Sequence, residues 1–283
     1  MKNILITLTC LFLSSHTVAD TLTQQVAQLE TQSGGRLGVA VLDTQNNHQW
    51  QYRGDERFPM MSTFKALMCA SALDLADQNK LSLNATTTIK ESDLVTWSPV
   101  TEKLIGQDMT IQQACEATML MSDNTAANIV LHQIGGPQQV TQFVRTLDDK
   151  VTRLDRYEPE LNQATPGDKR DTTSPHAMVT SLNTILLQDG LSEKNQQTLL
   201  TWMKNNKISD SLIRSILPQG WSIADRTGAG EQGSRAINAL VWNEQHKPII
   251  ISLYLTHTEL DIAQRNQTLN QVAKLVLEHF SVE

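Results

Sequence analysis

The sequence predicts an α+β fold in which both ends of the chain build one antiparallel sheet and the middle forms a helical block. Short β-rich runs separated by polar turns occur near both termini. Apolar residues at helical spacing instead fill the middle of the chain, from Ser62 to about Thr201. The 283 residues are enough for one large domain or two modest ones.

The strands are expected in two groups, with a helix at each outer end. The N-terminal strands should join at a turn formed by Asn46-Asn47. We expect an amphipathic helix before them, over 21–33, and a final helix that Thr258 caps and that reaches Phe280. The expected strands are 36–43, a second through Trp50 and Tyr52, 221–225, 236–242 and 249–256.

Helices of the middle block have recognisable boundaries. Helical spacing runs over 111–121 and 126–134, and Ser174 before Pro175 is typical of a capped helix start. The segment 151–173 has little periodicity and many charges. A loop of this length in a compact domain is usually functional.

The first nineteen residues have the features of a signal peptide. Lys2 precedes a short apolar core at 4–13, and Thr17-Val18-Ala19 offers a cleavage site before Asp20. The core is too short to span a bilayer as a helix, and a buried N-terminal helix is the alternative. We therefore expect export to the periplasm, or secretion if the host has no outer membrane.

Charge and cysteine content narrow the function classes further. The formal net charge of −7 argues against binding to nucleic acids or anionic membranes. Without the leader, two cysteines remain, Cys69 and Cys115. An even number in an exported protein favours one disulfide, with two buried thiols as the alternative.

The first motif, Ser62-Thr63-Phe64-Lys65, places a hydroxyl and an amine one helical turn apart on the same face. A neutral lysine there can take the proton of the serine, which is otherwise a weak nucleophile at neutral pH. The alternative is that Ser62 only caps the helix.

The second motif, Ser122-Asp123-Asn124, lies between two apolar helices. A hydroxyl at such a turn can pass a proton to a leaving nitrogen, and the amide beside it can bind a substrate carbonyl. Helix capping is the alternative, since all three residue types are preferred caps.

The third motif, residues 226–230 with the sequence Arg-Thr-Gly-Ala-Gly, ends a predicted strand. A cation and a hydroxyl there can hold a carboxylate, and the glycines let the backbone approach a ligand closely. A plain glycine turn after a strand is the alternative.

The fourth motif lies inside the long aperiodic loop. Glu158 and Asn162 are the residue types that can hold and activate one water molecule. A solvated charged loop is the alternative.

These four motifs, in this order, resemble the class A β-lactamases, from about residue 21 to the C-terminus. Arg226 departs from the usual Lys-Thr-Gly and resembles the Arg-Thr-Gly branch, the carbenicillinases. Arginine keeps the charge but cannot release a proton, which favours an electrostatic role for this residue. The resemblance implies a three-layer α/β/α domain plus an all-α domain, a fold shared with penicillin-binding transpeptidases.

The resemblance also implies the catalytic roles. Ser62 is the expected nucleophile, and Lys65 or a water held by Glu158 is the base for acylation. Glu158 should then activate the deacylating water, and Ser122 should protonate the lactam nitrogen. The backbone N–H groups of Ser62 and Ala229 should form the oxyanion hole.

Further residues are implied for binding and for support of the site. The substrate-binding set is Asn124, Asn162, Arg226, Thr227, Gly228, Ala229, Arg235 and Trp97. For Trp97 the alternative is a partly buried core aromatic. The family pairs Arg156 with Asp171 across the neck of the glutamate loop, and its helix-to-helix disulfide corresponds to Cys69 and Cys115.

The resulting interpretation is a secreted penicillinase that confers antibiotic resistance. We expect no metal or organic cofactor, no nucleic acid, no membrane anchor and a monomer. The expected domains are 20–60 with 212–283, and 61–211 with the 153–171 loop. A penicillin-binding peptidase and a β-lactam-sensing receptor are the rivals, but the first lacks the loop glutamate and the second is normally tethered to a membrane. A metal-dependent lactamase is disfavoured by the absence of paired histidine ligand spacing.

Overall fold

The structure is a computed structural model that describes residues 17–280, with side chains described from residue 21 onward. Most of the predicted signal peptide, residues 1–16, therefore lies outside the described residues. The predicted cleavage site falls at the start of helix α1 (Thr17–Ser33). Among the described residues, no helix combines the length and the apolar character that crossing a membrane requires.

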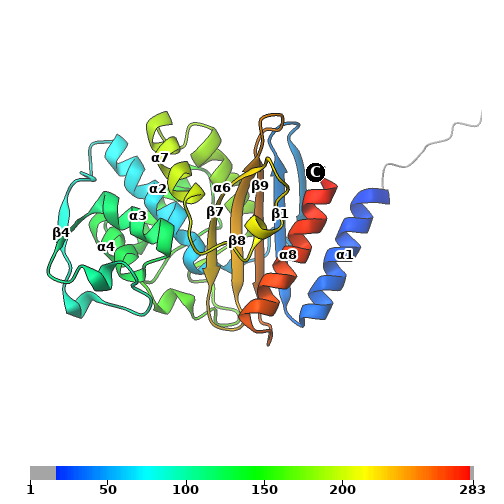
Figure 1. The fold of residues 1–283 in the computed structure, drawn as a ribbon, viewed down its shortest axis with the longest axis horizontal. Coiled ribbons are helices and arrows are strands. Elements are labelled where there is room, and N and C mark those ends of the chain that lie inside the picture. The colour runs from blue at the N-terminus through cyan, green and yellow to red at the C-terminus, as the bar shows by residue number, and fades with distance from the viewer. Residues whose placement is uncertain (1–16, 281–283) are drawn as a thin grey trace, which may run out of the picture.

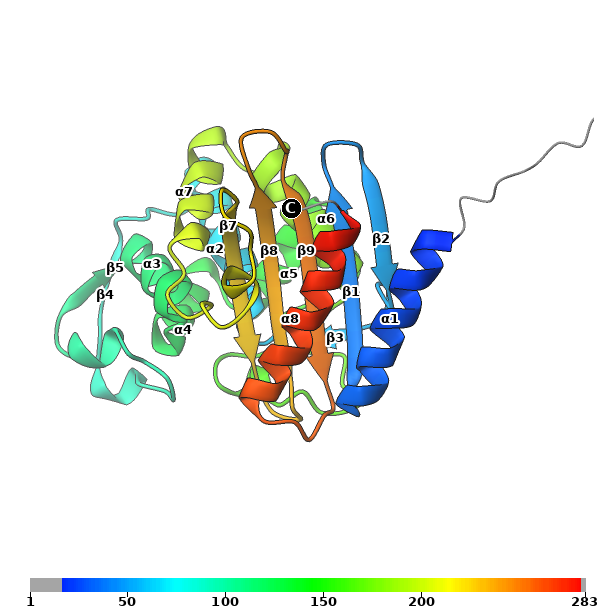
Figure 2. The same ribbon diagram turned by 45° about the vertical axis from the view of Figure 1, so that its right-hand side comes forward.

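A five-stranded antiparallel sheet forms the middle layer (Figure 1). Its strand order is β2-β1-β9-β8-β7, and all five strands are labelled in Figure 2. The strands are β1 (Arg36–Asp43), β2 (His48–Tyr52), β7 (Ser222–Ala229), β8 (Arg235–Trp242) and β9 (Ile249–Thr256). β1 pairs with β9 along its whole length, so the two ends of the chain meet in one sheet, as predicted. β7 extends beyond the predicted 221–225, because its residues pair with β8 as far as Ala229.

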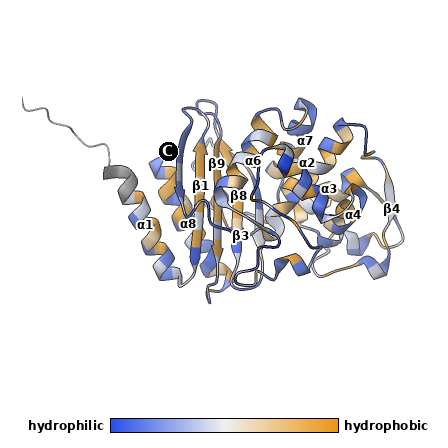
Figure 3. Ribbon diagram, turned by 180° about the vertical axis from the view of Figure 1, so that it is seen from behind, coloured by the Kyte–Doolittle hydropathy of each residue, from blue (hydrophilic) through white to orange (hydrophobic). Residues whose placement is uncertain are grey.

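Helices α1 and α8 (Ile262–His279) pack against each other on one face of the sheet (Figure 2). Their apolar residues, among them Val26 and Leu269, join residues of β8 and β9 in one buried cluster. In Figure 3 the central strands are largely hydrophobic, whereas the two helices alternate between hydrophobic and hydrophilic. Such a pattern suits helices with one face on the sheet and the other in water.

The start of α8 differs from the prediction. Asp261, and not Thr258, caps the helix, since its carboxylate accepts a hydrogen bond from the Gln264 N–H at 2.8 Å. The Thr258 hydroxyl instead donates to the carbonyl of Ser33 and so ties the end of β9 to α1. Both residue types are good caps, so the path of the turn after β9 decides between them.

The helical block covers the opposite face of the sheet (Figure 1). α6 packs on β1 and β9, and α2 lies at the centre, in contact with α3, α4, α5 and α7. Because α2 is enclosed by its neighbours, residues 64–73 are all buried rather than only one stripe of them. The helices are α2 (Phe64–Asp77), α3 (Ile111–Met121), α4 (Asn124–Ile134), α5 (Pro137–Thr146), α6 (Pro175–Leu187) and α7 (Glu193–Lys204).

Two short antiparallel pairs complete the fold: β3 (Phe58–Pro59) with β6 (Thr172–Thr173), and β4 (Thr86–Thr88) with β5 (Asp108–Thr110). The sheet between α1 with α8 and the helical block confirms the predicted α+β fold. Two large buried clusters lie on the two sides of the sheet. The division into domains at 60/61 and 211/212 stays a prediction.

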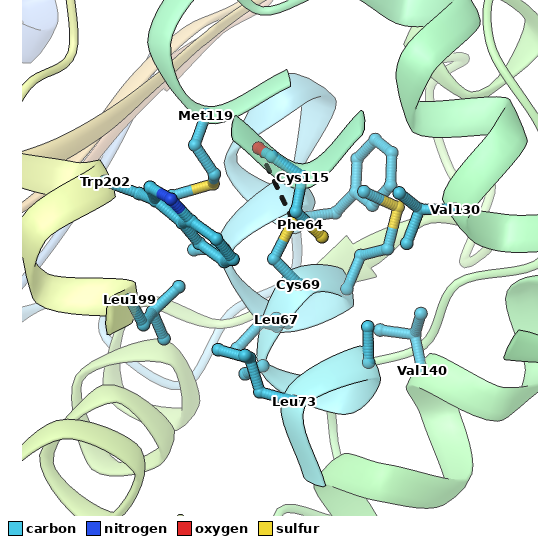
Figure 4. Close-up of a cluster of buried hydrophobic side chains, with 14 of the residues drawn as sticks. Phe64, Leu67, Cys69, Leu73, Cys115, Met119, Val130, Val140, Leu199 and Trp202 are labelled. Atoms are coloured by element: carbon cyan, nitrogen blue, oxygen red, sulfur yellow. Dashed lines mark hydrogen bonds between the residues drawn. The ribbon is translucent and has the colours of Figure 1, made fainter. Parts of the chain in front are cut away.

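Cys69 on α2 and Cys115 on α3 lie together in the core of the helical block (Figure 4). Both are free thiols, and the Cys69 Sγ lies 3.9 Å from the Cys115 carbonyl oxygen. The predicted disulfide is therefore absent from the structure, although the predicted proximity is present. Packing of α2 on α3 brings the side chains together without a bond, because a buried thiol fills space as a small apolar group. Burial also raises the pKa of the Cys69 thiol well above its usual value.

Candidate active site

Ser62 lies in a tight 3₁₀ turn, Met61–Thr63, that leads directly into α2. Helix α2 starts without a side-chain cap, so the alternative that Ser62 merely caps the helix is wrong. Ser62 is partly exposed, and its hydroxyl makes no hydrogen bond with the described residues. The position leaves that hydroxyl available to a ligand.

Lys65 lies one turn further along α2, and its side chain is fully buried. Its ammonium donates to the Ser122 carbonyl at 2.9 Å, to the Ser122 Oγ at 3.1 Å and to the Asn124 Oδ1 at 2.6 Å. The Glu158 Oε1 lies 3.1 Å away. Burial lowers the pKa of Lys65 to about 8; the attraction of Glu158 opposes this effect and the repulsion of Arg226 adds to it. A minority of Lys65 is therefore neutral at pH 7.

Ser122 ends α3 in the left-handed backbone conformation, with φ at 60°. A non-glycine residue in this region carries a cost of about 1–2 kcal/mol, and such strain is often found at functional sites. The capping alternative holds for Asp123 only, whose carboxylate accepts from the Ala126 N–H at 2.8 Å at the start of α4. Asp123 also accepts from the N–H of Val100 and from Thr101, and so holds the preceding loop.

Arg226 lies on β7 with its side chain fully buried, pointing at the same serine. Its Nη2 donates to the Ser122 Oγ, whereas its Nε and Nη1 find no partner among the described residues. Burial lowers the pKa of Arg226 to about 10, with Asp225 the main opposing charge, so the guanidinium remains charged at neutral pH. Buried, unpaired N–H groups on a cation are costly, and an anionic ligand would satisfy them.

Gly228 brings β7 against the start of α2. A Cβ at this position would lie 3.0 Å from the Met60 carbonyl oxygen and 3.1 Å from the Ser62 nitrogen. A Cβ there would be tighter than ordinary packing, so glycine eases this approach. As a result Ala229, which is exposed, follows directly beside the Ser62 turn.

The long loop delivers Glu158 to the same point, with 98% of its surface buried. The Asn162 Nδ2, from the 3₁₀ turn Glu160–Asn162, donates to the Glu158 Oε2. The Asn128 side chain accepts from the Glu158 N–H and donates to its carbonyl, both at 2.9 Å. Glu158, which precedes a cis-proline peptide, is thus held on both its side chain and its backbone.

An ion pair closes the neck of this loop. The Arg156 Nε lies 2.6 Å from the Asp171 Oδ2. The other oxygen of Asp171 accepts from the N–H groups of Asp155 and Arg156, at 2.7 and 3.0 Å. The carboxylate therefore fixes the start and the end of the loop against each other, as the resemblance implied.

Thr227 and Arg235 lie on the other face of the sheet from Arg226. The register pairs Thr227 with Ile237, which packs toward α8, whereas Arg226 pairs with Asn238. The Arg235 guanidinium donates to the Asn266 Oδ1 of α8 at 2.7 Å and to the Gly228 carbonyl at 3.1 Å. Arg235 therefore reaches back to the backbone of the third motif rather than to the Arg226 side chain.

Trp97 is 57% exposed, so the alternative of a core aromatic is wrong. Its indole N–H donates to the Met121 carbonyl at 3.0 Å, next to Ser122, and its own carbonyl accepts from the Asn124 N–H. The ring thus stands in solvent beside the second motif.

Sequence reasoning missed Asn128, Asp123 and Asn266 as supports of the site. Asn128 follows Asn124 by four residues on α4, which places both on one helix face, and that spacing was a usable signal. Asn266 lies 31 residues from Arg235, and only the packing of α8 on the sheet brings the two together.

The comparisons with known proteins agree with this arrangement. The chain matches the beta-lactamase enzyme family over residues 21–280. It is 50% identical over 258 residues to beta-lactamase CARB-3 of Pseudomonas aeruginosa, which covers 91% of this chain and 90% of that one. Beta-lactamase OXY-2 of Klebsiella oxytoca is 44% identical over 259 residues, with coverage of 92% and 89%.

Solved structures of beta-lactamases also match the fold of this chain. The chromosome-encoded beta-lactamase of Vibrio parahaemolyticus matches with a TM-score of 0.91 at 55% identity, covering 93% of this chain and 100% of that one. An ancestral class A beta-lactamase matches with a TM-score of 0.89 at 49% identity, covering 91% and 99%. The resemblance carried by the four motifs is confirmed. The chain therefore belongs to the beta-lactamase enzyme family, as a class A hydrolase of β-lactams in the carbenicillinase branch.

Proposed function

We propose that this enzyme opens the lactam ring of penicillins, carboxypenicillins included, through an acyl-enzyme on Ser62. The observation that carries the proposal is the placement of Lys65. Its ammonium is buried one helical turn from Ser62 and lies 3.1 Å from both the Ser122 Oγ and the Glu158 Oε1. An apolar residue would pack in this core at a lower desolvation cost, so the lysine indicates chemistry rather than stability.

In acylation the Ser62 Oγ attacks the lactam carbonyl carbon and its proton passes to a base. Two residues can provide this base, Lys65 and Glu158. Neutral Lys65 can take the proton directly, which its lowered pKa favours. Alternatively, Glu158 can take it through a water held by Glu158 and Asn162.

The Ser122 hydroxyl protonates the leaving nitrogen when the lactam C–N bond breaks. Its oxygen accepts from both Lys65 and Arg226, which occupies its two lone pairs. The hydroxyl hydrogen is then left to donate toward the substrate. The proton lost from Ser122 is replaced from Lys65.

Negative charge on the carbonyl oxygen is stabilised by the backbone N–H groups of Ser62 and Ala229. The close approach at Gly228 supports this pairing, because it sets β7 beside the first turn of α2. Backbone donors in such a hole need no reorganisation as the charge develops.

The ring carboxylate binds at Arg226. Two buried nitrogens of this residue have no partner among the described residues, and a carboxylate can accept from them. Thr227 and Arg235 lie on the other face of the sheet and support this subsite through the backbone, since the Arg235 guanidinium donates to the Gly228 carbonyl. Asn124 binds the side-chain amide of the substrate. Its Nδ2 donates one N–H to the Thr96 carbonyl, at 2.7 Å, and its second N–H can donate to the substrate. Trp97 forms the wall of the substrate cleft on its solvent-exposed side.

Deacylation separates this proposal from a penicillin-binding peptidase, in which the acyl group derived from penicillin stays attached to the serine. Glu158 supports hydrolysis because its carboxylate is buried beside Lys65 and is held by Asn162. The test mixes purified protein with a large excess of benzylpenicillin. We expect many turnovers per enzyme, and none for Ser62→Ala, which should remain folded and form no covalent adduct. Consumption that stops at one equivalent would favour the peptidase or the sensor.

We also propose that residues 1–19 direct export and that the mature enzyme acts as a monomer in the periplasm, without nucleic acid or membrane anchor. The basic start, short apolar core and small-residue cleavage site support export. N-terminal sequencing of exported protein should begin at Asp20. A retained leader would contradict this.

A further inference from the structure

A cavity of about 330 Å³ lies behind the loop that carries Glu158. The loop forms one wall, through Arg156, Leu161 and the stretch 164–170, and the starts of β1 and β3 form the other. Ser62, Lys65 and Glu158 do not line it. A volume of this size lies in the range of small-molecule sites.

The lining of this cavity is strongly basic. It includes five cationic side chains but only two carboxylates, Glu56 and Asp168, in a protein whose overall charge is −7. Positive charge concentrated in a concave surface raises the local concentration of anions. The five cations are Arg36, Arg57, Arg156, Lys169 and Arg170.

Three of these cations already have carboxylate partners. Arg36 pairs with Glu56, Arg170 with Asp168, and Arg156 with Asp171. Both carboxylates of the lining are therefore engaged in ion pairs, and two of the five cations have no carboxylate partner.

The two remaining cations, Arg57 and Lys169, make no ion pair within the part of the chain that the structure describes. Arg57 is half-buried and uses only its Nη1, on the Val151 carbonyl at 2.8 Å and the Thr172 Oγ1 at 3.0 Å. Burial lowers the pKa of Arg57; repulsion from Arg153 and Arg145 adds to this effect, and the attraction of Asp149 and Asp155 opposes it. A guanidinium that is partly desolvated and has no ion-pair partner gains from a bound anion.

A ring nitrogen of the lining is also without a hydrogen-bond partner. The Nε2 of His257 is buried and makes no hydrogen bond with the described residues. A ring nitrogen can donate to an oxyanion when it carries the proton.

We propose that this cavity binds a small multivalent oxyanion, a polycarboxylate or a phosphate compound, between Arg57, Lys169 and His257. Such a ligand bridges β3 and the Glu158 loop, and so it holds the loop against the sheet. The binding step stands independently of the activity. By holding the loop, the bound anion modulates deacylation, and this second step rests on the proposed function of Glu158.

The test needs no β-lactam and uses the whole mature protein. Citrate and inorganic phosphate are titrated by calorimetry at constant ionic strength, set with sodium chloride. We expect saturable binding of one anion per chain, and slower tryptic cleavage after Lys169 and Arg170 when it is bound. The stronger of the two probes identifies the source of the anion as a polycarboxylate or a phosphate.

Charge-removing variants locate the site. Lys169→Gln removes an exposed cation whose side chain makes no hydrogen bond or ion pair with the described residues, so folding should be unaffected. We expect this variant and Arg57→Gln each to bind at least about tenfold more weakly, as loss of a charge-assisted contact requires. Lys274→Gln, an equal charge loss on the remote face of α8, should bind like wild type. Equal binding by all variants, or no binding beyond that of chloride, would overturn the proposal.

Discussion

The ammonium of Lys65 lies 3.1 Å from the carboxylate of Glu158, and both side chains are fully buried. One carboxylate thus faces both candidate steps of the reaction: it raises the proton affinity of the lysine beside Ser62, and with Asn162 it can hold the hydrolytic water. The sequence separates the two residues by 93 positions, so this contact belongs to the tertiary structure.

Glu158→Ala should leave an acyl-enzyme that persists for minutes, because the deacylating water loses its base. Intact mass spectrometry after mixing with benzylpenicillin should show an adduct equal to the mass of the penicillin. Asp168→Ala, which removes a partly buried carboxylate from the same loop, should show no persistent adduct. Unchanged steady-state turnover of Glu158→Ala would assign deacylation to another group.

Glu158→Gln should shift the pH dependence of acylation downward. In the wild type, burial lowers the pKa of Lys65 from its usual 10.5 to about 8, and Glu158 opposes this shift. Removing that negative charge leaves burial and Arg226, so the pKa should fall below 8 and neutral Lys65 should prevail at lower pH. Single-turnover acylation rates, measured from pH 5 to 10, should therefore rise at lower pH in the variant. A profile with no titration in this range would exclude Lys65 as the base.

Arg226 should set the preference between singly and doubly charged penicillins. Carbenicillin carries a side-chain carboxylate besides the one on the ring, and the planar guanidinium offers five donors where an ammonium offers three. Arg226→Ala should impair both substrates, by about 1.5–3 kcal/mol in transition-state binding. Arg226→Lys should retain much of the benzylpenicillin activity and lose proportionally more on carbenicillin.

The measurement for Arg226 is the ratio of kcat/KM for the two substrates in each variant. The wild type should hydrolyse both at comparable rates. An unchanged ratio in Arg226→Lys would show that another part of the cleft sets the preference.

Asp171→Asn should loosen the loop that carries Glu158, because it weakens the ion pair with Arg156 at the loop neck. We expect a loss of about 1–3 kcal/mol in the free energy of unfolding, and slower deacylation with near-normal acylation. Asp168→Asn weakens an ion pair at the surface of the same loop, with Arg170, and should change neither quantity appreciably. Equal effects of the two substitutions would show that the neck contact does not order the loop.

Cys69 and Cys115 should resist alkylation in the folded protein. Both thiols are buried, and burial raises the pKa of Cys69, so little reactive thiolate forms at pH 8. Iodoacetamide should label both residues only after unfolding, as peptide mapping without reductant would show. A mass two hydrogens lower, without labelling after unfolding, would establish a disulfide instead of the free thiols.

The helices and strands were largely predictable because each depends on local pattern. The strand over 36–43 and the helix over 111–121 have the predicted bounds. Errors arose where two local choices were equally good: Asp261 rather than Thr258 begins the last helix, and two cysteines in contact need not be bonded. In the first case the path of the chain after β9 decides, and in the second the packing of α2 on α3 brings the thiols together without a bond; neither is a local property.

The sequence by itself determined the fold class, the family and the residue types of the site, because motif spacing and hydrophobic periodicity are carried along the chain. Tertiary structure alone decided how those residues meet. Packing of α2 between β7 and the loop buries Lys65 among Ser122, Glu158 and Arg226, and that burial, not the residue type, lowers its pKa. The strand register likewise separates Arg226 from Thr227 and Arg235, since neighbouring residues of a strand point to opposite faces of the sheet.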